Sequence, residues 1–121
     1  MAHQDFELTI ATVTEALKQE GFGIVTEIDM KDTLQKKLSV DFRKYKILGA
    51  CHPSIALMVL NLAPKMGVFM PCNVVVEENE QGKVEVTIVD PYNAMNAFNN
   101  EALTLIAKEV QQKLQNVMSS L

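Results

Sequence analysis

Apolar residues recur along this chain at two spacings, and the spacing indicates the element that each segment forms. Residues 5–20 repeat every three to four positions, which predicts an amphipathic helix. Its apolar face consists of Phe6, Ile10, Val13 and Leu17. The end of the chain, from Asn99 or Asn100 onward, predicts a second long helix in the same way. Its stripe consists of Leu103, Ile106, Val110, Leu114 and Val117.

Residues 22–29 alternate between apolar and polar, which predicts a strand. Ideal alternation places Phe22, Ile24, Thr26 and Ile28 on one face, and Val25, Glu27 and Asp29 on the other. A short helix through Leu38 is expected next, with Asp29 or a neighbour as its N-cap.

The middle of the chain joins a strand directly to a helix. Residues 47–52, "ILGACH", predict the strand, and Pro53 is suited to the first position of the helix. Residues 54–62 are apolar nearly all round, so we expect this helix to be deeply buried. Pro64 is expected to end it.

Two further strands are predicted to form a hairpin. Residues 66–78 predict one strand interrupted at Pro71, which indicates a bulge or an edge position. The turn "ENEQG" and the alternating residues 83–90 complete the hairpin. Asp90 and Pro91 then predict the start of another helix.

This order of elements predicts an α+β fold, in which helices pack on one face of a mainly antiparallel sheet. A length of 121 residues corresponds to a single domain, residues 1–121, that is large enough for a core without disulfides or metals.

Charge and hydropathy limit the classes of partner that we expect for this protein. A net charge of -4 gives no broad attraction to phosphate backbones, so we expect no nucleic-acid partner. The longest apolar run, residues 55–60, is far shorter than the ~20 residues that span a bilayer, so we expect no membrane partner. The first residues, "MAHQDFE", lack the features of a signal peptide, which predicts a cytoplasmic protein with reduced thiols.

Cys51, His52 and Cys72 are the first candidate site residues. Cys51 precedes a predicted helix N-terminus, where a thiolate would be stabilised. Three readings stay open for the two cysteines: buried core residues, a thiol or disulfide pair, or a soft-metal site for zinc or copper(I) that includes His52. Their spacing matches no recognised metal motif, so we assign no metal ligands. The methionines are interpreted as core residues.

Glu27, Asp29 and Asn73 are the remaining candidates for ligand binding. Two carboxylates on one strand face are compatible with acid–base chemistry, and a hydrolase is therefore a third hypothesis. Such residues are also common on the solvent face of a sheet, and Asp29 could instead cap a helix. Nucleotide-binding loops, nucleophile elbows and stacking platforms are absent from the sequence, so we assign no catalytic residue and leave the cofactor unknown.

Four blocks, "EGFGIVTEIDMKDTLQKKLSVDF", "YKILGACHP", "PCNVVVEE" and "VDP", together resemble the domain of unknown function 302 family over essentially the whole chain. The resemblance implies a TATA-binding-protein-like layout with a curved antiparallel sheet, a long C-terminal helix and dimers. It lends no catalytic residues. His52 stands where the resemblance leads us to expect asparagine, and only "MAHQD" precedes Phe6, where relatives often have an opening strand.

We therefore predict a small homodimeric protein that binds a ligand or a partner without catalysis. The alternative is a thiol-dependent redox or soft-metal protein that uses Cys51 and Cys72. Two dimer surfaces are expected: the sheet edge near the start of the chain, and the apolar stripe of the last helix.

Overall fold

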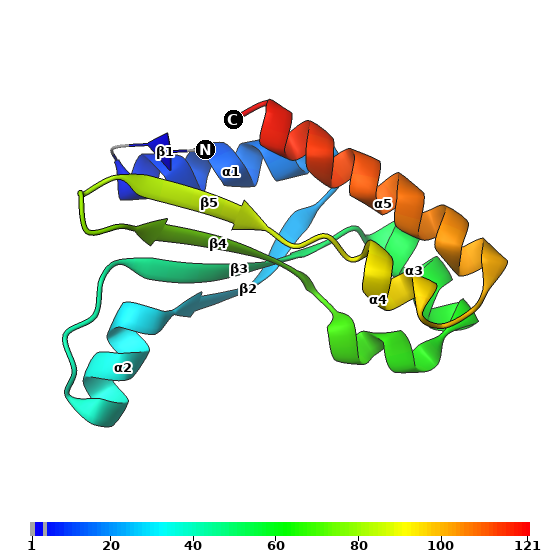
Figure 1. The fold of residues 1–121 in the computed structure, drawn as a ribbon, viewed down its shortest axis with the longest axis horizontal. Helices are drawn as coiled ribbons and strands as arrows, with labels where there is room; N and C mark the ends of the chain where they lie inside the picture. The colour runs from blue at the N-terminus through cyan, green and yellow to red at the C-terminus, as the bar shows by residue number, and fades with distance from the viewer. Residues whose placement is uncertain (1, 4) are drawn as a thin grey trace.

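One open sheet of five antiparallel strands organises the molecule (Figure 1). The computed structural model describes residues 2–3 and 5–121, with side chains from residue 5 onward. The strand order is β1-β5-β4-β3-β2. The strands are β1 (Ala2–His3), β2 (Gly23–Asp29), β3 (Tyr45–Cys51), β4 (Cys72–Glu78) and β5 (Val84–Ile88). The predicted α+β class and the predicted hairpin, β4–β5, are confirmed.

Two long helices, α1 (Phe6–Gln19) and α5 (Glu101–Ser119), lie across one face of this sheet (Figure 1). The shorter α3 (Pro53–Leu62) and α4 (Tyr92–Asn96) pack against α5 beyond the end of β3. A 3₁₀ helix, η1 (Pro64–Phe69), follows α3, whereas α2 (Met30–Leu38) stands apart where β2 meets β3. The long helices begin where predicted, because Asp5 and Asn100 accept hydrogen bonds from Leu8 N and Leu103 N.

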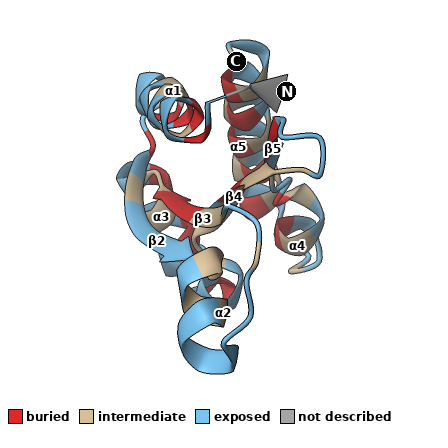
Figure 2. Cartoon of the chain, turned by 90° about the vertical axis from the view of Figure 1, so that its left-hand side faces the viewer, coloured by how far each residue is buried: buried red, intermediate tan, exposed pale blue. Residues whose placement is uncertain are grey.

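The core forms between the covered sheet face and the apolar helix stripes (Figure 2). On the sheet, Leu48 lies opposite Val74, and Val76 lies opposite Val86, so their side chains share the covered face. The predicted α5 stripe is buried except at Ile106, which is half-buried, and Ala107 takes its place against the sheet. The buried members of α5 are Leu103, Ala107, Val110, Leu114 and Val117.

Two predictions about the middle of the chain are wrong. Residues 66–69 belong to the 3₁₀ helix η1, because Pro64 starts a new turn and only Met66 of its six residues is buried. The helix α3 is not deeply buried: Ile55 and Val59 face the core, while Leu57 is 64% exposed. The sheet ends before α3 begins, so only one side of this apolar helix finds a partner.

The alternation predicted for β2 is interrupted. Ile24 lies opposite Ala50, but Thr26 lies opposite the next residue, Gly49, so Val25 is an unpaired bulge. Ile24 therefore shares the covered side of the sheet, and Thr26 with Ile28 takes the open side. Glu27 and Asp29 do share one face, as expected.

The two dimer surfaces expected from the sequence differ in the structure. At the sheet edge, the two-residue strand β1 pairs with β5 only at Val84 and Glu85, two of its five residues. The apolar stripe of α5 is buried in the core, so it is not available for contact with a second chain.

Candidate functional site

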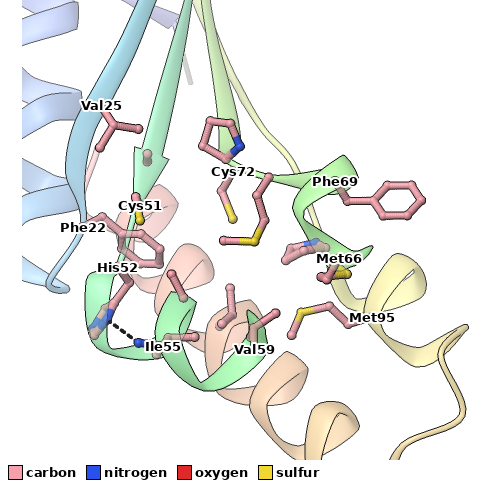
Figure 3. Close-up of a pocket in the computed structure, with 16 residues that line it drawn as sticks. Phe22, Val25, Cys51, His52, Ile55, Val59, Met66, Phe69, Cys72 and Met95 are labelled. Atoms are coloured by element: carbon pink, nitrogen blue, oxygen red, sulfur yellow. Dashed lines mark hydrogen bonds between the residues drawn. The ribbon is translucent and has the colours of Figure 1, made fainter. Parts of the chain in front are cut away.

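A pocket of about 280 Å³ opens at the end of the sheet where β3 leads into α3 (Figure 3). Its walls come from four places: the ends of β2 and β3, the start of β4, the inner face of α3 with η1, and the α4–α5 region. Nearly all of the lining side chains are apolar. Its sixteen lining residues are Phe22, Val25, Ala50, Cys51, His52, Ile55, Ala56, Val59, Met66, Phe69, Met70, Pro71, Cys72, Pro91, Met95 and Val110.

The fold brings the two cysteines to this pocket from neighbouring strands. Cys72 begins β4 opposite Ala50, the residue immediately before Cys51 on β3. Both are free thiols, and both side chains are directed into the pocket in Figure 3. Burial raises the pKa of Cys72 to about 11, with a smaller contribution from the neighbouring Cys51. Cys72 is therefore a neutral thiol at physiological pH and a weak nucleophile.

His52 closes one end of the pocket as the N-cap of α3. Its Nδ1 accepts a hydrogen bond from Ile55 N over 3.4 Å, so the cap requires an unprotonated Nδ1. Its ring meets Phe22 edge to face, with centroids 5.4 Å apart. On its far side, Nε2 lies so close to Gly21 that a Cβ there would be only 2.6 Å away. The imidazole is thus held in a capping position.

Two exposed apolar side chains, Val25 and Phe69, also line the pocket. Val25 is 61% exposed and Phe69 is 56% exposed. The bulge in β2 leaves Val25 outside the regular pairing, which is how bulges commonly redirect a side chain beside a site. A ligand entering the pocket would cover apolar surface that is otherwise in water.

The remaining predicted site residues lie away from the thiols. Glu27 and Asp29 lie toward the far end of β2, roughly 13 Å and 20 Å along the strand from Gly23, the residue opposite Cys51. Asn73 is exposed on the open side of the sheet opposite Gly49. None of the three lines the pocket.

Glu27 and Asp29 are occupied by structural contacts. Glu27 Oε1 pairs with Lys46 Nζ at 2.9 Å, and this hydrogen bond raises the pKa of Lys46 against the opposing effect of burial. Asp29 Oδ1 accepts from Asp32 N at 3.0 Å, which confirms its capping of α2. These contacts offer no acid–base pair, so the hydrolase hypothesis gains nothing from the geometry.

Across the part of the chain that the structure describes, no three side chains of His, Cys, Asp or Glu gather as metal ligands. In the same part, no helix has both the length and the apolar character needed to cross a membrane.

Sequence reasoning found three pocket residues, Cys51, His52 and Cys72, and missed the others. The core interpretation of the methionines is confirmed for Met66 and Met95, which are buried, and is wrong for Met58, which is 44% exposed. The common position of Met66, Met70 and Met95 in one pocket depends on how η1 and α4 pack. Val25 had no local signal, because a bulge follows from the pairing register with β3.

Comparison with known proteins places the chain in a family. The family described as "Domain of unknown function DUF302" matches residues 1–121. A crystal structure of an uncharacterised conserved DUF302 protein from Bacillus stearothermophilus is similar, with 30% identity and a TM-score of 0.86. The match covers 99% of this chain and 95% of that one. No curated protein matches the chain.

Proposed function

The chain belongs to the DUF302 family, whose function is unknown, and we propose that it is a binding protein that holds a small apolar ligand in the pocket between β3 and α3. The observation that carries this proposal is the pocket itself, whose walls are almost entirely apolar. Small-molecule sites are typically concave, apolar and supplied with a few polar groups that set orientation. Here the polar groups are two thiols and the His52 ring.

The volume sets the size of the ligand. A cavity of ~150 Å³ holds a benzene molecule, so about 280 Å³ accommodates a ligand roughly twice that size. An aromatic or branched aliphatic molecule with one weak hydrogen-bonding group fits this description. None of the sixteen lining residues is Asp, Glu, Lys or Arg, so a strongly ionic ligand would lose hydration without compensation from them.

Binding without catalysis agrees with the chemistry of the lining. The thiol of Cys72 stays protonated at neutral pH, and the His52 Nδ1 is engaged by Ile55 N. A thiol–imidazole nucleophile would need the imidazole free to accept the thiol proton. Two unpaired cysteines also fit a reducing compartment such as the cytoplasm.

Methionine methyl groups provide the test, because three of them line the pocket. In protein labelled with [¹³C-methyl]methionine, small aromatic and branched aliphatic compounds should shift the NMR signals of Met66, Met70 and Met95. The signals of Met30 and Met118, which lie outside the pocket, should stay in place. Equal shifts at all positions, or no shift with any compound, would remove the proposal.

A pocket-filling variant makes this test sharper. Ala56→Leu adds three carbons inside the pocket on α3 and should weaken binding at least tenfold. Ala102→Leu makes the same change on the exposed side of α5 and should leave binding unchanged. If both variants bind like the original chain, the ligand does not occupy this pocket.

We further propose that the functional form is a homodimer, formed through an apolar area that we call the α3–η1 surface. Its members are Leu57, Met58, Leu60, Leu62, Val68 and Phe69, all of them exposed. Val68, at 82%, is the most exposed of these side chains. A standard interface buries ~800 Å² on each partner, and these six exposed side chains would form its apolar centre.

Charge supports a second copy as the partner. A two-fold interface brings identical patches together, so a charged patch would repel itself. Residues 53–76 contain a single charged side chain, Lys65, in a protein with a net charge of -4. Phe69 belongs both to this surface and to the pocket wall, so dimer formation would also shield the pocket from water.

Sedimentation velocity at micromolar concentration tests the dimer. Leu57→Glu should convert the dimer to a monomer, because it buries a carboxylate in the contact. Leu105→Glu is the matched control, since Leu105 is similarly exposed, at 67%, but lies on α5 outside the surface. A chain that sediments as a monomer, or a dimer that survives Leu57→Glu, would contradict this interface.

A further inference from the structure

Sulfur atoms are concentrated in the pocket beyond what an apolar ligand requires. The chain has seven methionines and two cysteines, and five of these nine residues line the one pocket: Cys51, Cys72, Met66, Met70 and Met95. From this clustering we propose that the pocket is a copper(I) site, with the two cysteine sulfurs as its main ligands and a methionine thioether beside them.

The topology supplies sulfur from three directions. Cys51 and Cys72 come from the paired strands β3 and β4. Cys72 lies opposite Ala50, the residue immediately before Cys51. Met66 and Met95 approach from η1 and α4, on the opposite side of the pocket from the strands (Figure 3). Met70 lines the pocket from the segment between η1 and β4. The pocket thus has sulfur in its wall on the strand side, on the helix side and in the segment that joins them.

The type of ligand selects the metal. Thiolates and thioethers are soft ligands that favour copper(I), whereas thioethers contribute little to zinc. Structural zinc takes four ligands from cysteine, histidine or carboxylate, and no cluster of three such residues occurs in the described part of the chain. His52 is directed to Gly21 and Phe22 rather than to the thiols, so it leaves the coordination to sulfur.

The charge of the complex stays small. One copper(I) with two thiolates carries a single negative charge, and thioethers add none, so the pocket has to accommodate only one net charge. Each thiol that ligates the ion as a thiolate releases one proton to solvent. No electron is transferred, because copper enters and leaves as copper(I) and both cysteines are free thiols.

Competition with the copper(I) chelator bicinchoninate, under anaerobic conditions, measures the affinity of the chain for copper(I) and the number of ions that it binds. All proteins carry His3→Ala, because imidazole is itself a common metal ligand and His3 would add a second binding group. The parent chain should withdraw one copper(I) per chain from the chelator. Cys51→Ser and Cys72→Ser should each weaken binding at least 100-fold, and X-ray absorption should report only sulfur neighbours around copper.

The methionines decide whether the thioethers take part. Substituting Met66, Met70 and Met95 by leucine one at a time should weaken copper binding about tenfold in at least one case. Met118→Leu, outside the pocket, is the matched control and should have no effect. Copper held equally well by the double serine variant, or no copper withdrawn by the parent chain, would overturn the site. If all three leucine variants bind like the parent, the thioether ligand is wrong.

The copper site requires the pocket but not the apolar ligand, so the two experiments fail separately. Methyl shifts with apolar compounds but no copper binding would leave the proposed function standing and remove the copper site. Copper binding without any methyl shift from apolar compounds would leave the copper site standing and remove the proposed function. Circular dichroism of every variant confirms that a loss of copper is not a loss of fold.

Discussion

At the scale of single residues, Cys72 and His52 show how burial and backbone position decide chemistry. Cys72 begins a strand and points into an apolar pocket, where its charged form is poorly solvated. His52 ends the chain segment before a helix and satisfies a backbone N–H with Nδ1. One residue is kept neutral by its surroundings, and the other is kept in place by the helix that it starts.

The raised pKa of Cys72 predicts a loss of stability at high pH. An unfolded cysteine has its model value of 9.0, and the folded thiol ionises near 11. The folded state therefore holds its proton more tightly, so this stability is complete below pH 9 and is lost as the pH rises through 11. A shift of this size corresponds to about 2–3 kcal/mol.

Urea unfolding of the parent chain and of Cys72→Ala at pH 8 and at pH 11 checks this expectation. Between pH 8 and pH 11, the free energy of unfolding of the parent chain should fall by that amount relative to that of Cys72→Ala. Cys51→Ala serves as the control for a neighbouring thiol. A difference that stays constant from pH 8 to pH 11 would show that Cys72 ionises normally in the folded chain.

The His52 cap predicts an asymmetry between two substitutions. His52→Ala leaves Ile55 N without its acceptor and should cost about 1 kcal/mol more than His52→Asn, because asparagine is among the best N-caps. Both variants lose the contact with Phe22, so their difference isolates the cap. Chemical denaturation gives the two free energies of unfolding, and equal values would show that the hydrogen bond contributes nothing.

At the scale of elements, β2 and α2 have few or no buried side chains. No residue of α2 is buried, and most of β2 is exposed (Figure 2). The helix is held by the Asp29 cap and by Lys31 Nζ, which donates to Asp41 Oδ1 at 2.8 Å and to the carbonyl of Phe42 at 2.6 Å. These polar contacts fix its position without adding a hydrophobic core.

Amide hydrogen exchange should therefore separate α2 from the sheet. Local opening free energies follow buried apolar contact, so the α2 amides should open at least ~2 kcal/mol more easily than those of β4. The central amides of α5, which carry a buried stripe, are the internal control and should match β4. Exchange of α2 at the same free energy as β4 would mean that α2 unfolds only with the whole domain.

At the scale of the whole molecule, the pocket exists because the helices extend beyond the sheet. The core between the sheet and helices α1 and α5 is closed, but α3, η1 and α4 surround a region where the strands have ended (Figure 1). Side chains there have partners on some sides only. The result is a pocket next to an exposed apolar surface, rather than an extension of the core.

Filling that space should stabilise the free protein. Ala56→Leu places a larger apolar side chain in the pocket, and each buried methylene is worth about 0.8 kcal/mol, so a net gain of roughly 1 kcal/mol is expected after losses from repacking. Ala102→Leu, on the exposed side of α5, should change stability by less than ~0.5 kcal/mol. Thermal unfolding of both variants measures the difference, and a lower melting temperature for Ala56→Leu would show that the pocket has no room for the side chain.

The sequence by itself determined the elements whose causes are local. Helical spacing fixed α1 and α5, side chains such as Asp5, Asp29 and Asn100 marked where helices start, and alternation with a turn fixed the β4–β5 hairpin. The two cysteines and His52 could be singled out because a strand joined to a helix at Pro53 is visible in the residues. These features depend on neighbours within a few positions.

Only the tertiary structure decided the rest, because it depends on contacts between distant segments. The bulge at Val25 follows from the register of β2 on β3, and the exposure of α3 follows from where the sheet stops. The separation of Glu27 and Asp29 from the thiols follows from the direction of β2 along β3. The gathering of five sulfur atoms around one pocket requires β3, β4, η1 and α4 to converge, and no local pattern in the chain records that convergence.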